Sequence, residues 1–102
     1  MHKQTYLQTE FEKILGSRNV YFQPPTSVKM SYPCIRYSMN RIDKLNANDK
    51  FYWSINEYEV TVIDSDPLST IAKDILVNFP SAKFDRQYVS ENLYHSVITL
   101  YF

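Results

Sequence analysis

The chain has 102 residues, with 11 Lys and Arg against 11 Asp and Glu, and 44% of it is hydrophobic. This length predicts a single domain over residues 1–102, and the balanced charge lacks the basic excess typical of a dedicated nucleic-acid binder. No apolar run approaches the ~20 residues of a membrane span, and residues 1–8 lack the apolar core of a signal peptide, so we expect a soluble protein that is not secreted.

A first helix is predicted over residues 5–15. Its apolar face is formed by Leu7, Phe11, Ile14 and Leu15, which share one side of a 3.6-residue period. Thr5 and Gln8 have the spacing of a capping box. The one glycine, Gly16, stands where a left-handed C-terminal cap is expected.

Two short strands follow, over residues 20–23 and from 34 to 37 or a little beyond. Pro24 and Pro25 end the first strand, and because proline has no N–H for a ladder, we expect that strand at an edge or a turn. Cys34 is the only cysteine, which excludes an intramolecular disulfide, and its apolar context favours a small core residue.

Residues 40–50 are polar and show no strand period. Only Ile42, Leu45 and Ala47 are apolar, and the three asparagines favour turns. This pattern predicts an extended loop, either a contact arm or a plain solvated hairpin connection.

The longest strand signal covers residues 51–63. From Tyr58 the pattern alternates, with Tyr58, Val60 and Val62 on one face and Glu57, Glu59, Thr61 and Ile63 on the other. The two glutamates indicate that their face meets water or a partner.

A second helix is predicted from Pro67 to its end at Pro80. Asp66 suits the N-cap and Pro67 the first helical position. Its apolar face contains Leu68, Ile71, Ala72, Ile75, Leu76 and Phe79.

Two further strands, over residues 82–89 and 93–102, are separated by a turn short enough for a hairpin. The last strand is partly apolar on both faces, which favours helices on one side and a neighbouring subunit on the other. The order of elements predicts an α+β fold, a mainly antiparallel sheet of four to five strands with two helices packed on one face.

No motif for catalysis, cofactor binding or metal binding emerges. One glycine excludes a phosphate-cradling loop, and Cys34 with His95 is a weak nucleophile and base combination. The carboxylate pairs Glu57 with Glu59 and Asp64 with Asp66 are explained better by a solvated face and by helix capping. We therefore expect no enzyme activity, no cofactor and no metal.

Aromatic residues make up 16% of the chain, and nine are tyrosines. Runs such as residues 20–22 and 51–53 are able to stack on exposed bases, which keeps a single-stranded nucleic-acid or peptide-binding module open as an alternative. The neutral charge favours core and subunit-interface roles for these side chains instead.

Four fragments in order resemble small tail-completion (tail-terminator) proteins of long-tailed bacteriophages. They are NVYFQPP at residues 19–25, MSYPCIRY at 30–37, YEVTVIDSDP at 58–67 and DRQYVSENLYH at 85–95. The similarity spans roughly residues 19–102. The chain also resembles neck and head–tail joining proteins, which have a similar size and fold.

The resemblance implies a structural virion protein. Such a protein forms a ring, usually of six copies, at the head-proximal end of the tail, ends polymerisation of the tail tube and joins the tail to the neck. It implies copies of the chain, the tail tube protein and a neck or connector protein as partners, with DNA able to pass through the ring, and no membrane. Its location is the virion, and the host cytoplasm during assembly.

Contact residues for such a ring are expected in and around residues 40–50. Charged side chains there suit partner surfaces, and nearby aromatics suit interface anchors. The candidate interface residues are Arg41, Asp43, Lys44, Lys50, Tyr52, Trp53, Glu57 and Glu59.

Overall fold

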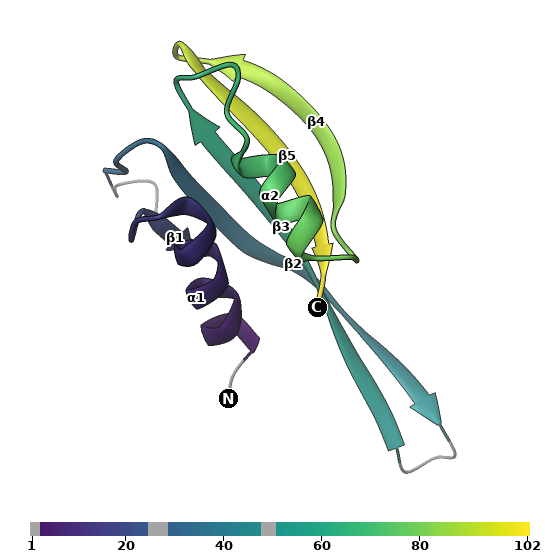
Figure 1. Cartoon of the computed structure of the whole chain (residues 1–102). Coiled ribbons are helices and arrows are strands. Elements are labelled where there is room, and N and C mark those ends of the chain that lie inside the picture. The colour runs from purple at the N-terminus through teal and green to yellow at the C-terminus, as the bar shows by residue number, and fades with distance from the viewer. Residues whose placement is uncertain (1–2, 25–28, 48–50) are drawn as a thin grey trace.

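The computed structural model describes residues 3–24, 29–47 and 51–102, and describes the backbone alone at residues 3–4, 41–47 and 51–55. Two helices and five strands follow in the order α1 (Lys3–Leu15), β1 (Val20–Phe22), β2 (Cys34–Ala47), β3 (Phe51–Asp64), α2 (Ile71–Asn78), β4 (Lys83–Ser90) and β5 (Leu93–Tyr101). The strands form one sheet in the order β1-β2-β3-β5-β4, in which β1 is parallel to β2 and the other neighbours are antiparallel. Both helices cover the same face of the sheet (Figure 1). The expected α+β architecture is confirmed.

The core lies between the helices and this face of the sheet, which we call the inner face. Alternate residues of the strands point into it because side chains of a strand alternate between faces. Tyr37 and Tyr58 are the largest fully buried side chains. The buried cluster consists of Leu7, Phe11, Val20, Ile35, Tyr37, Tyr58, Val60, Val62, Ile75, Phe79, Ile98 and Leu100.

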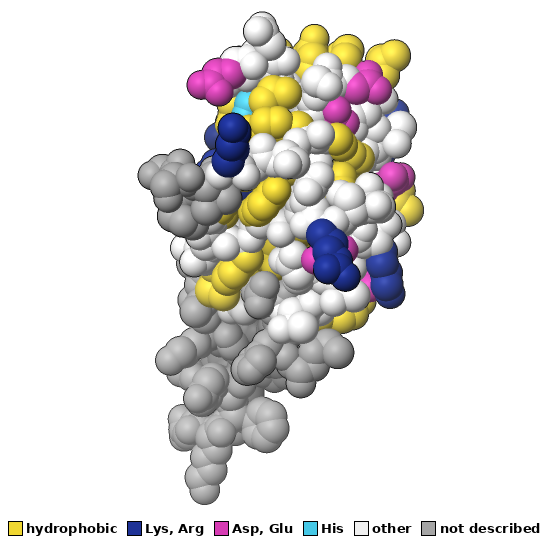
Figure 2. Space-filling model, turned by 90° about the vertical axis from the view of Figure 1, so that its left-hand side faces the viewer, with side chains coloured by type: hydrophobic (Ala, Val, Ile, Leu, Met, Phe, Trp, Pro, Cys, Tyr) yellow, Lys and Arg dark blue, Asp and Glu magenta, His cyan; other side chains and the backbone are white. Residues whose placement is uncertain are grey.

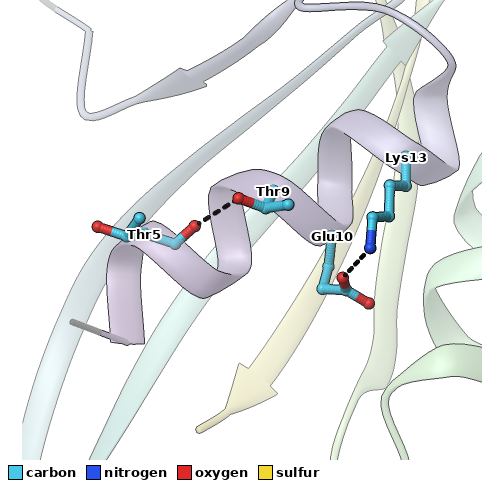
Figure 3. Close-up of polar contacts among 4 residues, drawn as sticks. All are labelled: Thr5, Thr9, Glu10 and Lys13. Carbon is cyan, nitrogen blue, oxygen red and sulfur yellow. Dashed lines mark hydrogen bonds and ion pairs between the residues drawn. The ribbon is translucent and has the colours of Figure 1, made fainter. Parts of the chain in front are cut away.

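Helix α1 begins before the predicted capping box. Thr5 lies inside the helix, and its carbonyl accepts a hydrogen bond from the Thr9 hydroxyl at 3.1 Å (Figure 3). The Gln8 side chain does not reach back to a helix start: it donates to the Val20 carbonyl and to Glu12, each at 3.0 Å. The capping-box interpretation is therefore wrong, because Gln8 connects α1 to the sheet.

The C-terminal end of α1 follows the prediction. Gly16 has φ +80° and donates its N–H to the Glu12 carbonyl at 2.9 Å, which is the left-handed cap expected of glycine. Strand β1 then takes the edge position, as its prolines indicate.

The predicted loop at residues 40–50 is wrong over most of its length. Residues 40–47 continue β2, and β3 begins at Phe51, so the two strands form a long antiparallel hairpin with Ala47 opposite Phe51; residues 48–50 lie outside the described part of the chain. The sequence shows no strand period there because neither of the two described helices covers a face of this ribbon (Figure 1). We call residues 41–47 and 51–55 the arm.

The arm projects beyond the rest of the molecule (Figure 1). The chain measures 51 × 26 × 23 Å along its principal axes, with a radius of gyration of 14.7 Å. A compact chain of 100 residues has a radius of gyration of about 13 Å. The excess follows from the arm, which extends past the point where Phe102 and Asn56 exchange backbone hydrogen bonds.

Helix α2 is shorter than predicted. It begins at Ile71 with Thr70 as its N-cap, and the expected N-cap, Asp66, instead accepts the Leu68 N–H at 2.9 Å in the turn before it. Asp-Pro favours an Asx-type turn as well as a helix start, and the turn prevails here. Leu68, predicted on the apolar face, consequently lies before the helix and is 83% exposed, whereas Phe79 ends the helix before Pro80 as expected.

Strands β4 and β5 form the predicted hairpin. Glu91 and Asn92 have φ of +53° and +64°, the pair of positive values that a two-residue type I′ turn requires. The register shifts between Phe84 and Arg86, which marks a bulge in β4.

Candidate assembly surfaces

The second face of the sheet, the outer face, has no helix on it in the part of the chain that the structure describes (Figure 1). Three apolar side chains are nevertheless almost fully buried there: Cys34, Ile63 and Val97 expose 0, 2 and 1% of their surface. The outer face therefore has an apolar floor with a polar and aromatic rim.

One part of this rim is an aromatic stack. The rings of Tyr88 and His95 lie parallel with centroids 4.7 Å apart, and the Arg86 guanidinium is 5.9 Å from the Tyr88 ring centre. His95 Nδ1 lies 3.1 Å from the Leu93 carbonyl. Arg86 also pairs with Asp85 at 2.6 Å, so this rim carries both signs of charge.

Cys34 and His95 do not form a nucleophile and base pair. Both are opposite Ile63 in the register, on the two sides of β3, so their backbones are about 10 Å apart. Burial raises the pKa of the Cys34 thiol to about 11, with Arg36 acting in the opposite direction. The thiol is therefore protonated and shielded at neutral pH.

The two carboxylate pairs have structural partners. Glu57 accepts a hydrogen bond from the Tyr101 hydroxyl at 3.0 Å, and Glu59 is opposite Thr99 on the same outer face. Asp64 accepts the Asp66 N–H at 3.0 Å within the turn before α2. Neither pair is arranged as two convergent acid groups in a cavity.

Among the described residues, no group of three or more His, Cys, Asp or Glu side chains is placed to hold a metal ion. Over the same residues, neither helix has the length and apolar character needed to cross a membrane.

An open groove lies on the inner face between α2 and β4. It has a volume of about 420 Å³, and its apolar walls include Leu68, Leu76 and Phe84, with Lys73 and Gln87 among its polar lining. Ser96 at its floor accepts a hydrogen bond from Gln87 at 3.2 Å. The groove exists because α2 starts late and is too short to cover β4.

Strand β4 is the most open element of the sheet. All eight of its residues are exposed, and Phe84, Tyr88 and Val89 leave 50, 42 and 61% of their surface in solvent. Within the described residues it pairs with β5 alone, so its other edge presents unpaired backbone groups. This edge is not among the predicted contact sites. The feature of the sequence that points toward it is the last strand, which is partly apolar on both faces.

The predicted interface residues fall mainly on the arm. Arg41, Asp43 and Lys44 lie in its β2 strand, and Tyr52 and Trp53 in its β3 strand. Glu57 and Glu59 lie at its base on the outer face, where both are half-buried, and Lys50 lies outside the described residues. The structure thus gathers seven of these eight residues along one hairpin.

No protein-family model matches this chain, and no curated protein is significantly similar to it.

Proposed function

We propose that this chain is a structural subunit that acts by assembling with copies of itself and with other proteins. The observation that supports this best is the pair of unlike open surfaces on one sheet, the projecting arm on one side and the exposed edge of β4 on the other. A ring needs two different complementary patches on each subunit, because its contacts are head-to-tail. This chain offers two such patches.

The particular assembly that we propose is the terminator ring of a bacteriophage tail, following the resemblance of the fragments at residues 19–25, 30–37, 58–67 and 85–95. In this role the ring ends polymerisation of the tail tube and joins the tail to the neck, and DNA passes through it. Its partners are the tail tube protein and a neck or connector protein, in the host cytoplasm during assembly and then in the virion. We propose no catalytic role.

A neck or head–tail joining protein is the closest alternative, because it would use the same kind of ring. Labelling the chain in intact particles and imaging them by electron microscopy distinguishes the two positions. A label at the junction of tube and neck supports the terminator role, and a label between neck and head supports the joining role. Particles without the label would refute both.

Assembly itself is tested with the purified protein. Light scattering over a range of concentrations measures its mass, and addition of purified tail tubes tests binding at the tube end. We expect rings alone or at tube ends, and tubes that no longer elongate when further tube protein is supplied. Tubes that continue to grow at an unchanged rate would contradict the terminator proposal.

A second candidate, from another class, is binding of single-stranded nucleic acid on the outer face. The stack of Arg86, Tyr88 and His95 favours it, because bases stack on aromatic and guanidinium groups. On the side of the molecule shown in Figure 2, however, acidic and basic side chains are scattered among apolar ones. Oligonucleotide binding that weakens steeply with salt would favour this candidate over assembly.

A further inference from the structure

Two open sheet edges of comparable length lie on opposite sides of this molecule. One is β4, with eight residues. The other is β2 beyond Met39, whose N–H donates to the Gln23 side chain at the end of β1. From there β3 is the one described neighbour, so residues 40–47 leave an edge open. The two edges run in opposite directions, since β4 is antiparallel to β5, β5 to β3, and β3 to β2.

The arm and the groove are both left uncovered by the described part of one chain, and each would cover the other in a second copy. A two-stranded ribbon is marginally stable in water and gains stability from a third strand or a packed face. Beside β4, the groove lined by Leu68, Leu76 and Phe84 is an apolar surface that α2 leaves open. In a second copy, β4 would supply the third strand and α2 would supply the covering surface.

We infer that β4 of one copy adds as an antiparallel strand to the β2 edge of the arm of the next copy, with the arm lying along the groove between β4 and α2. This inference rests on the proposed function only in requiring copies of the chain to assemble. The sheet then continues from one copy to the next with its inner and outer faces unchanged.

The charges along the two edges favour one register. The sequences are Arg41-Ile42-Asp43-Lys44 on β2 and Lys83-Phe84-Asp85-Arg86 on β4. An antiparallel alignment that sets Asp43 opposite Arg86 also brings Lys44 beside Asp85, the extra residue of the β4 bulge. Opposite charges at facing positions stabilise a strand pair, and like charges destabilise it.

This register also sets a stagger between copies. Within one chain, Arg86 lies in the same row as Val97, Thr61 and Arg36. In the proposed contact, Arg86 faces Asp43 of the next copy. Asp43 lies about 20 Å farther along β2 than Arg36, when the extra residue of the bulge after Met39 is left out of the count. Four strands span about 19 Å, so the strands would tilt by about 45°, the upper end of the range for closed barrels.

The area involved shows why the groove matters. An edge of eight residues is about 27 Å long and a sheet layer about 10 Å thick, so edge pairing alone covers about 270 Å² of each partner. A stable interface needs about 800 Å² per partner. The remainder has to come from the inner face of the arm against the groove and from side chains on the outer face.

Cysteine cross-linking tests the pairing directly. In a Cys34→Ala background, Asp43→Cys and Arg86→Cys chains are mixed and oxidised with copper phenanthroline, and dimers are measured on non-reducing gels. We expect dimers in the mixture and none from either variant alone, because facing residues of an antiparallel pair bring their Cβ atoms to about 5 Å. Lys13→Cys, on the exposed side of α1, is the matched control that should give none with Asp43→Cys.

The outcomes separate this inference from the proposed function. Light scattering on the same samples reports whether copies associate. Associated copies without the mixed cross-link, or a cross-link from Arg86→Cys alone, would overturn the strand addition and leave assembly standing. A monomer at every concentration, with no cross-link, would count against both.

Charge reversal gives an independent measurement. Asp43→Arg and Arg86→Asp should each weaken association about three- to tenfold, since each sets like charges opposite one another. An equimolar mixture of the two variants restores part of the association through the restored pair. An unchanged affinity in both single variants would refute the register.

Discussion

At the scale of single residues, Gln8 is a polar side chain that connects three elements. It accepts the Tyr37 hydroxyl at 2.8 Å and donates to the Val20 carbonyl, so one side chain joins α1 to both β1 and β2. Tyr37 is fully buried, so its hydroxyl needs partners inside the protein. This connection holds the first helix at the β1 edge of the sheet.

Replacing Gln8 by Ala should lower the free energy of unfolding by about 1–3 kcal/mol, because buried polar groups lose a partner. Tyr37→Phe removes the hydroxyl itself and should cost about 0.5–1.5 kcal/mol. Urea unfolding of both variants and of the double variant gives the coupling between the two side chains. A double-variant loss equal to the sum of the single losses would show that they do not interact.

Cys34 predicts a dependence of stability on alkaline pH. Its pKa rises from 9.0 to about 11 on folding, chiefly through burial. Between these values the folded chain holds a proton that the unfolded chain has lost, so stability is full below pH 9 and falls as pH rises toward 11. At pH 10.5 this difference in pKa lowers the free energy of unfolding by about 2 kcal/mol.

Other groups also titrate in this range, so the measurement is a comparison. The drop in unfolding free energy from pH 8 to pH 10.5 should be smaller in Cys34→Ala than in the original chain. The native thiol should also react slowly with a thiol reagent at pH 8. Equal drops in both chains, with rapid labelling, would contradict a buried high-pKa thiol.

At the scale of elements, the β4–β5 turn holds a residue poorly suited to its backbone. Glu91 adopts φ +53°, which is unfavourable for most residues other than Gly, Asn and Asp. Glu91→Asn should therefore raise the free energy of unfolding by about 0.5–1 kcal/mol, as measured by thermal or urea unfolding. Glu91→Ala is the control and should give no such gain; an equal gain from Ala would indicate an effect of charge.

The elements that the sequence predicts well are those with one buried face. Helix α1 and the core part of β3 repeat or alternate against the core, and their patterns identify them. Strand β4, whose eight residues are all exposed, is instead predicted from its strand-forming residues and its short turn to β5. The predictions fail where burial is missing: residues 40–47 form a ribbon without a covered face, so no period marks them as a strand. The late start of α2 has another cause, since Asp66 and Pro67 suit a turn as well as a helix.

The candidate surfaces follow the same rule. The sequence indicates the candidate contact residues Arg41, Asp43 and Lys44 because of their charge, and the structure places them along one hairpin. The β4 edge and the groove depend on how far α2 covers the sheet. That coverage is a tertiary property which no local pattern of Phe84 or Leu68 reveals.

At the scale of the whole molecule, the arm is separable from the core. The last described contact between β3 and the C-terminal end lies at Asn56, and the buried cluster begins at Tyr58. Replacing residues 44–54 by an Asn-Gly turn should therefore leave a folded chain. Far-ultraviolet circular dichroism and thermal unfolding check the fold.

The same shortened chain should have a radius of gyration near 13 Å in place of 14.7 Å, as measured by small-angle X-ray scattering. It should also fail to assemble with copies of itself, because each contact needs the arm of one copy and β4 of the next, and the shortened chain keeps only β4. Shortened chains that assemble as well as the original would show that the arm has no part in the interface.

The alternation of side chains along the hairpin also restricts how its reach can change. Adding one residue to each strand would exchange the sides toward which every more distal side chain points, whereas adding two would preserve them and extend the tip by about 7 Å. Viable variants of different reach are therefore expected to differ by even numbers of residues per strand.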